Sequence, residues 1–224
     1  SRRQRQMCIR DSAYKIALSG YPGPVHLSVP VDIMFSSFEE DSQRDERPFI
    51  RKAESPPKAW PEPQRLQSIR EEFEKSKKPM LIGGHGVWWG NAEKKLEEVG
   101  KTLKIPVYNI PYHQKLLPET SDAYMGLADI HQYPPSAKGL EESDLVMMLG
   151  GRLDNQMNFG NPPLFPKNSR LICINGSPEE LEQNRSADQI LLSDPSAFLE
   201  ALMDFGKSRT SKERDEWYLS LIHI

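Results

Sequence analysis

The sequence lacks long hydrophobic runs, and no apolar stretch approaches the roughly 20 residues that a membrane-spanning helix needs. This absence argues against a membrane partner. Low-complexity segments and internal repeats are also missing, which argues against fibrous and repeat architectures. No paired carboxylates, catalytic-triad motif or metal-ligand spacing occurs. The sequence therefore gives no support for catalysis by this segment alone.

The two ends of the chain do not resemble native protein sequence. Residues 1–12 are basic and have no hydrophobic periodicity. Residues 7–12 and 219–224 back-translate to DNA strings that are reverse complements of each other, and these strings resemble the end of a transposon-based sequencing adapter. The alternative is a basic targeting arm over residues 1–12. It would make the complementarity of the two DNA strings a coincidence. We therefore expect both ends to be artefacts and leave them out of the fold prediction.

Cysteine is scarce, and basic residues are fewer than acidic ones once these ends are set aside. The remainder holds 25 basic and 31 acidic residues, a net charge of −6 against −3 for the full sequence. This balance argues against a nucleic-acid partner. One cysteine remains, Cys173, which excludes an internal disulfide and favours a reducing, cytoplasmic location.

Residues 13–33 have the pattern of the end of a domain, although they lie near the start of the chain. Residues 13–18 predict the last turns of a helix, and Gly20 suits a left-handed C-cap. Residues 25–29 predict a short strand, closed by Pro30. Because a helix end and one strand cannot bury a core, we expect them to pack against structure upstream that this chain lacks.

The rest of the chain predicts one domain between two linkers. Residues 34–63 are polar, charged and proline-bearing, and residues 207–218 are polar again. Between them, residues 64–206 have the size of one ordinary domain. Apolar runs separated by helical patterns predict strands at residues 80–82, 105–108, 144–149, 170–174 and 189–192. Such strands indicate a parallel sheet covered on both faces, a Rossmann-like, doubly wound α/β fold.

The first candidate site is the loop after the first strand, because ligands bind at the carboxyl ends of strands in such sheets. The loop contains Gly83, Gly84, His85 and Gly86 and leads into a helix, the usual context of a phosphate-binding loop. The dinucleotide fingerprint is incomplete, since Trp89 replaces its third glycine and Asn109 replaces its acid, so no conventional NAD site is expected. The alternative is a tight turn that needs glycine.

Two further loops follow predicted strands. Arg152 and Asp154 lie in the first, and two interpretations are open: Arg152 holds a phosphate, or it pairs with Asp154 or another acid. The second runs from Asn175 to a predicted capping box of Ser177 and Glu180 at a helix start. Its free amides either meet an anion or are capped, and we favour capping.

The remaining polar and aromatic candidates carry weaker signals. No metal-ligand spacing surrounds the histidines, so structural or exposed positions are expected for His85, His113 and His131. Cys173 is interpreted as a core residue, and core packing is the favoured role of Trp88 and Trp89. Residues 112–119, including Lys115, form either a ligand groove or an ordinary connection.

Taken together, these segments resemble the thiamine-diphosphate-dependent enzymes of the acetolactate synthase family. Residues 20–32 resemble the end of that family's pyrimidine-binding domain. Residues 78–86, 105–107, 117–119 and 143–160 follow in the order found in its central domain. The resemblance covers residues 13–217 and implies an enzyme that cleaves or joins carbon–carbon bonds of 2-oxo acids with thiamine diphosphate and Mg²⁺, as a homodimer or homotetramer.

The resemblance also implies that the family's catalytic machinery lies outside this chain. Its catalytic glutamate belongs upstream of Ala13, and its Gly-Asp-Gly motif for magnesium and diphosphate belongs beyond Trp217. The fragment itself is therefore expected to be inactive.

By the same resemblance, FAD or ADP binds the central domain through Gly83, Gly84, His85, Gly86, Arg152, Asp154 and Asn175. The sequence departs from the flavin pattern at Asn175, where an acid is common, and at residues 193–195, where a glycine–aspartate pair is common. The loop from Arg152 to Gly160 also resembles 2-hydroxyacyl-CoA and oxalyl-CoA lyases, which act on acyl-CoA substrates. A non-catalytic nucleotide-binding or structural module is a third interpretation.

Overall fold

The computed structural model describes residues 2–35, 57–111, 115–129, 134–207 and 211–222. The chain divides into two compact units, Ser1–Pro57 and Lys58–Ile224. Within the described residues, no helix is long and apolar enough to cross a membrane.

The first unit contains helix α1 (Arg2–Leu18) and the short helix α2 (Val31–Met34). The backbone is helical across residues 12 and 13, where the expected artefactual end meets the predicted helix end. Gly20 has the predicted left-handed conformation, with φ of 60°. The predicted strand at residues 25–29 is wrong: these residues are irregular, and their apolar side chains are exposed. A strand needs a neighbour for its backbone hydrogen bonds, and the described part of this unit contains none.

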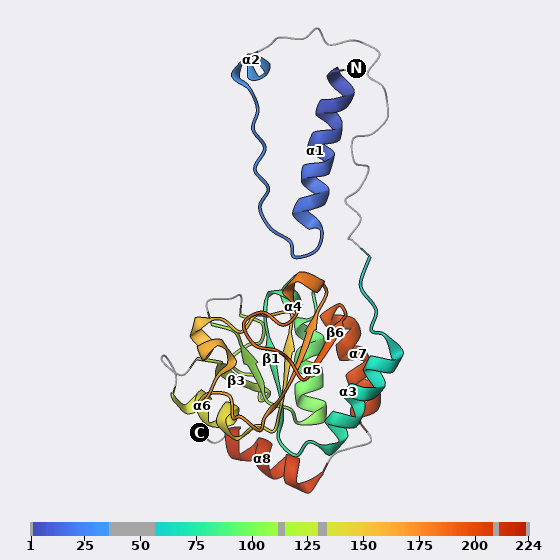
Figure 1. Ribbon diagram of the computed structural model, residues 1–224. Helices are drawn as coiled ribbons and strands as arrows, with labels where there is room; N and C mark the ends of the chain where they lie inside the picture. Colours follow the sequence, from blue (N-terminus) through green and yellow to red (C-terminus); the bar gives the residue numbers. More distant parts are fainter. Residues whose placement is uncertain (1, 36–56, 112–114, 130–133, 208–210, 223–224) are drawn as a thin grey trace. The chain divides into compact units, whose positions relative to one another are not determined.

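The second unit is a six-stranded parallel sheet in the order β3-β2-β1-β4-β5-β6 (Figure 1). The strands are β1 (Pro79–Gly83), β2 (Val107–Asn109), β3 (Tyr124–Leu127), β4 (Leu145–Leu149), β5 (Arg170–Asn175) and β6 (Gln189–Leu192). The helices are α3 (Pro63–Lys75), α4 (His85–Trp89), α5 (Glu93–Leu103), α6 (Pro134–Glu142), α7 (Pro195–Gly206) and α8 (Lys212–Ile222), with 3₁₀ turns η1 (Asn155–Gly160) and η2 (Pro178–Glu180). The predicted doubly wound α/β fold is confirmed.

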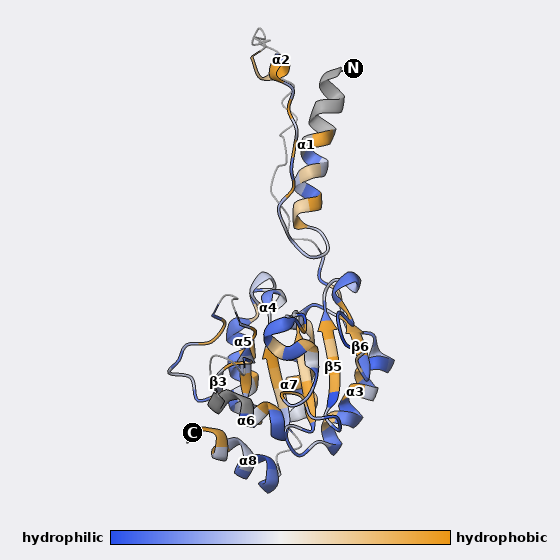
Figure 2. Cartoon of the chain, turned by 60° about the vertical axis from the view of Figure 1, so that its left-hand side comes forward, coloured by the Kyte–Doolittle hydropathy of each residue, from blue (hydrophilic) through white to orange (hydrophobic). Residues whose placement is uncertain are grey.

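Each face of the sheet has its own core, which explains the apolar strands seen in Figure 2. In β1, Leu81 packs with the buried side chains of α3, α5 and α7. Its neighbours Met80 and Ile82 pack on the other face, with side chains of α6, η1 and α8. Since alternate residues of a strand point to opposite faces, a strand covered on both sides favours apolar residues at successive positions.

Helix α8 lies largely within residues 207–218, for which the sequence predicted a linker. Arg214 is buried, and its guanidinium donates to the carbonyl oxygens of Phe73 and Ser76 at the end of α3. The Tyr218 hydroxyl donates to the Asp122 carbonyl oxygen (2.8 Å), just before β3. These contacts place α8 at the amino-terminal edge of the sheet (Figure 1).

Candidate functional site

The carboxyl ends of the strands bring the three predicted loops to one edge of the sheet. After β1 the chain builds β2 and β3 on one side, and it then returns to build β4, β5 and β6 on the other. The edge beside β1 and β4 is therefore the topological switch point, where open α/β sheets bind ligands. The loops after β1, β4 and β5 all reach it.

The glycines after β1 and β4 permit two loops to touch. Gly84 N–H donates to the Leu149 carbonyl oxygen (2.9 Å), and Gly86 N–H donates to that of Gly150 (2.8 Å). A Cβ atom on Gly84 would lie 2.6 Å from the Gly151 Cα atom, and one on Gly86 would lie 2.6 Å from the Gly150 Cα atom. The close approach of two backbones thus explains these glycines. It also uses two of the amides that a phosphate would need.

His85 follows Gly84 at the start of α4. Partial burial lowers the pKa of its imidazole. At neutral pH the ring is therefore mainly uncharged, so His85 adds little positive charge to this edge.

Arg152 was expected to hold a phosphate or to pair with an acidic side chain. In the structure it pairs with Glu180. Its Nε and Nη2 atoms donate to the two carboxylate oxygens of Glu180 as a fork. The Arg152 side chain is 53% exposed and that of Glu180 only 5%, so Arg152 is the member of the pair that solvent reaches. Asp154 instead accepts from Gln156 N–H (3.0 Å) and caps η1.

The predicted capping box at Ser177 is therefore wrong. Glu180 points to Arg152, and the Ser177 hydroxyl donates to the Glu179 carboxylate (2.5 Å) rather than capping. The helix expected there is only the single turn η2. By contrast, Asp194 caps α7 as predicted, accepting from Ser196 N–H (2.8 Å).

Sequence reasoning missed Asn184 and Arg185, which hold the loop after β4. Asn184 Nδ2 donates to the Leu153 carbonyl oxygen (2.8 Å), and Arg185 Nη1 donates to that of Gly160 (2.6 Å). They stabilise a tight turn in which Asn158, Phe159 and Gly160 all have positive φ. No periodicity marks either residue, because both act through backbone carbonyls some 25 to 31 positions away.

Two buried asparagines end strands at this edge. Asn175 ends β5, and its Oδ1 atom accepts from Ser177 N–H (3.2 Å), while its Nδ2 atom is buried and has no hydrogen-bond partner among the described residues. Asn109 ends β2, and its buried Oδ1 atom likewise has no partner in the described part of the chain. Of the two, only Asn175 belongs to the loops in which the family resemblance implies nucleotide binding, and an unsatisfied buried polar atom is uncommon.

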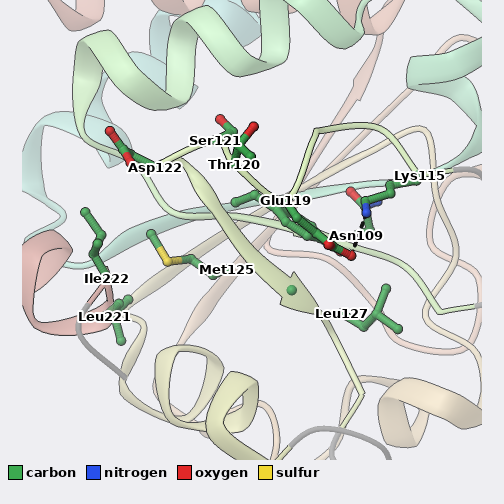
Figure 3. Close-up of a pocket in the computed structure, with 12 residues that line it drawn as sticks. Asn109, Lys115, Glu119, Thr120, Ser121, Asp122, Met125, Leu127, Leu221 and Ile222 are labelled. Atoms are coloured by element: carbon green, nitrogen blue, oxygen red, sulfur yellow. Dashed lines mark hydrogen bonds and ion pairs between the residues drawn. The ribbon is translucent and has the colours of Figure 1, made fainter.

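A cavity of about 590 Å³ runs along the edge strand β3 (Figure 3). Asn109 lines it, and Met125 and Leu127 supply apolar lining. Lys115 and Glu119 pair at its side (2.7 Å), so this lysine lines a groove. The burial of Tyr124 and the nearby Glu119 charge raise the pKa of its phenol.

The weaker candidates have mixed outcomes. His113 and His131 lie outside the described residues. Cys173 is a core residue as expected, and burial raises the pKa of its thiol to about 11. Core packing is wrong for the tryptophans: Trp88 and Trp89 stack edge to face and are 39% and 44% exposed. In the described ranges, no group of three or more metal-ligating side chains is present.

Comparison with known proteins now decides the family. Residues 66–202 match the thiamine pyrophosphate enzyme central domain. The chain belongs to the thiamine pyrophosphate enzyme family. That matched range covers the sheet and the three loops of the carboxyl edge.

Relatives and solved structures agree with this family. The chain is 27% identical over 221 residues to the acetolactate synthase large subunit of Cyanidium caldarium, covering 96% of this chain and 37% of the relative. It is 29% identical over 202 residues to that of Lactococcus lactis subsp. lactis, covering 90% and 34%. The chain thus spans about a third of the length of these relatives.

Two solved structures share the fold. Benzoylformate decarboxylase from Polynucleobacter necessarius superposes with a TM-score of 0.65 at 21% identity, covering 87% of this chain and 35% of that one. A thiamine diphosphate-dependent 4-hydroxybenzoylformate decarboxylase from Rhodococcus jostii RHA1 has a TM-score of 0.58 at 18% identity, covering 73% and 30%.

Proposed function

We propose that this chain is the central-domain part of an acetolactate synthase-like enzyme that uses thiamine diphosphate and Mg²⁺ to cleave and join carbon–carbon bonds of 2-oxo acids. The observation that carries the proposal is the central-domain match over residues 66–202, together with acetolactate synthase relatives that align along 90% or more of the chain. In such an enzyme thiamine diphosphate supplies the carbon nucleophile.

The part of this chain in that enzyme is structural. Its sheet presents the loops after β1, β4 and β5 at one edge, and Arg152, Asn184 and Arg185 hold the loop after β4 in a single shape. We propose that the catalytic groups belong to the flanking parts of a protein about three times as long, so the fragment itself is inactive. A homodimeric or homotetrameric assembly and a cytoplasmic location belong to the same proposal.

We propose a nucleotide, FAD or ADP, as the ligand of the carboxyl edge. Convergence of the loops at the topological switch point supports it. Several polar groups here already have partners within the chain, namely the Gly84 and Gly86 amides, the Arg152 fork and the Asp154 carboxylate. The fit therefore rests on Asn175, whose amide nitrogen has no partner within the described ranges of the chain.

The runner-up function is a 2-hydroxyacyl-CoA or oxalyl-CoA lyase. The loop from Arg152 to Gly160 supports it, because its sequence resembles those lyases and its turn is tightly held. A non-catalytic central module is the third candidate.

One substrate comparison separates the three candidates. The full-length protein, purified and supplied with thiamine diphosphate and Mg²⁺, is given pyruvate, oxalyl-CoA or a 2-hydroxyacyl-CoA in separate assays. Released CO₂ is measured in the first two, and formyl-CoA, the product of cleaving a 2-hydroxyacyl-CoA, is measured in the third. The synthase-like proposal expects product from pyruvate only. Product from either acyl-CoA but not from pyruvate would replace it with the lyase, and no product in any assay would favour the non-catalytic module.

A further inference from the structure

The turn after β5 contains the one Asn–Gly pair of the sequence, Asn175 and Gly176. In such a pair the backbone nitrogen of the glycine can attack the amide carbon of the asparagine side chain, because no Cβ atom shields that nitrogen. The attack closes a cyclic succinimide and expels ammonia. Three features of this turn favour the reaction in the folded chain.

The first feature is the direction of the Asn175 side chain. Its Oδ1 atom accepts a hydrogen bond from Ser177 N–H (3.2 Å). The ring that this bond closes includes the Gly176 nitrogen, so the side-chain amide of Asn175 is folded toward that nitrogen. The donated hydrogen bond also polarises the amide carbonyl group, which makes its carbon a better target for a nucleophile.

The second feature is the leaving group. Asn175 Nδ2 has no hydrogen-bond partner among the described residues. By contrast, the amide nitrogens of Asn158 and Asn184 donate to the carbonyl oxygens of Pro162 (2.9 Å) and Leu153 (2.8 Å). Those bonds must break before either nitrogen can leave, which has a free-energy cost. The fold adds no such cost at Asn175.

The third feature is the space around Gly176. This residue is exposed, although Asn175 itself is only 5% exposed. A Cβ atom added to Gly176 would have its nearest neighbours at 4.0 Å, so the turn is not packed tightly at this point. Solvent therefore reaches Gly176, where it can take up the amide proton and supply water to the succinimide.

We propose that Asn175 is a site of spontaneous deamidation, by which the folded chain gains a negative charge at the carboxyl edge as it ages. The Gly176 nitrogen loses its proton to water and bonds to Asn175 Cγ, the Cγ–Nδ2 bond breaks, and ammonia leaves. Water then adds to one of the two ring carbonyl carbons and opens the ring to aspartate or isoaspartate. No oxidant or reductant is consumed, since asparagine and water become aspartate and ammonium.

Deamidation should weaken the fold around this turn. It places a carboxylate where Asn175 is buried, and a buried carboxylate is unfavourable unless a cation pairs with it. Isoaspartate also lengthens the backbone at residue 175, whose carbonyl oxygen accepts from Ser193 N–H (2.9 Å) where β5 meets β6. We therefore expect the aged chain to unfold at a lower urea concentration. This expectation does not depend on the proposed nucleotide.

The first test follows the reaction in the folded 224-residue chain at mildly alkaline pH, with peptide mapping by mass spectrometry. Conversion at Asn175 should be about tenfold faster than at Asn158 or Asn184. The control variant is Gly176→Ala, whose added methyl group fits the open space but shields the nitrogen, and conversion at Asn175 should become about tenfold slower. No conversion at Asn175, or an equal rate in Gly176→Ala, would overturn the proposal.

The second test separates the structure of this turn from the chemistry of any Asn–Gly pair. The same chain is incubated in urea, and the rate at Asn175 in the folded chain should lie within about threefold of the rate in the unfolded chain. A folded rate far below the unfolded rate would show that the fold protects Asn175 and would overturn the proposal.

The third test measures the consequence for stability. Asn175→Asp, which carries one of the two products, should lower the urea midpoint of unfolding more than Gly176→Asp, which adds the same charge at an exposed position. Equal midpoints for the two variants would contradict the expected weakening of the fold.

Discussion

At the scale of single residues, contacts within the chain organise the carboxyl edge and occupy several of its polar groups. Glycines bring the loops after β1 and β4 together, and the Arg152 fork joins the loop after β4 to the turn after β5. The sequence indicated the glycines and the arginine, because both residue types are unusual after an apolar strand. It did not indicate Glu180 as the partner, since a local capping box accounted for that residue equally well.

Gly84→Ala should destabilise the second unit. The added methyl group would lie 2.6 Å from the Gly151 Cα atom and 2.7 Å from the Gly150 carbonyl oxygen, and backbone cannot move aside cheaply. We expect the free energy of unfolding in urea to fall by about 2–3 kcal/mol. The matched control is Gly176→Ala, whose nearest neighbours are 4.0 Å away, with a change within about 0.5 kcal/mol. Equal effects of the two substitutions would contradict the close-approach explanation.

Arg152→Met should leave the Glu180 carboxylate buried without its fork. We expect a loss of about 2 kcal/mol in the free energy of unfolding, because an unpaired buried charge costs more than the pair contributes. The double variant with Glu180→Gln should recover part of that loss, which a urea titration of both variants measures. Lys115→Met, at the exposed pair with Glu119, is the control and should change stability by less than about 0.5 kcal/mol. A double variant no more stable than Arg152→Met would argue against the pair.

Cys173 should make the folded chain sensitive to alkali. Burial raises the pKa of its thiol to about 11 from an ordinary value of 9.0, so the unfolded chain loses this proton first. Its contribution to stability is complete below pH 9 and is lost as pH rises through 11. The free energy of unfolding should therefore fall between pH 9 and 11, and fall less steeply in Cys173→Ala. Parallel pH profiles for the two proteins would contradict this.

At the scale of elements, strands could be predicted where the sequence contains a continuous apolar run. They were mispredicted where strand formation depends on a neighbouring strand distant in the sequence. Strands β1, β4 and β5 were predictable because both of their faces are buried, which forces continuous apolar runs. Strand β3 was missed because it is short, half-buried and at the edge of the sheet. The strand expected at residues 25–29 is absent for the opposite reason, since its residues suit a strand but find no partner strand among the described residues.

Helix α8 shows how a polar segment can still be part of a domain. Arg214 is 4% exposed, bonds to the end of α3 and lies 4.4 Å from the centroid of the Phe73 ring. A polar sequence pattern cannot reveal this, because the buried group is the charged one.

Arg214→Met should release α8 from the sheet. Loss of the guanidinium leaves the carbonyl oxygens of Phe73 and Ser76 without this donor, and we expect about 2–3 kcal/mol less stability. Hydrogen exchange of residues 212–222 should become faster than in Lys212→Met, whose side chain is 89% exposed. Continued protection of α8 in Arg214→Met would show that other contacts hold it.

At the scale of the whole molecule, residues 66–202 of the second unit match the thiamine pyrophosphate enzyme central domain, and we propose that they build a scaffold rather than a reaction centre. The fold and the family could be predicted, because the apolar runs, the loops and the motifs follow one another in the sequence in a recognisable order. The nucleotide ligand that we propose for the carboxyl edge was less predictable, because the fit of a ligand depends on which polar groups remain unpaired after folding. Asn175 stands out only once the partners of its neighbours are known.

The most direct measurement compares cofactor-dependent turnover of the full-length protein with that of the 224-residue chain. Both are stripped of cofactor and then titrated with thiamine diphosphate in the presence of Mg²⁺, while CO₂ release from pyruvate is followed. We predict saturable, thiamine diphosphate-dependent release by the full-length protein and none by the chain alone. Turnover by the chain alone, or release by the full-length protein that does not depend on thiamine diphosphate, would contradict the proposal.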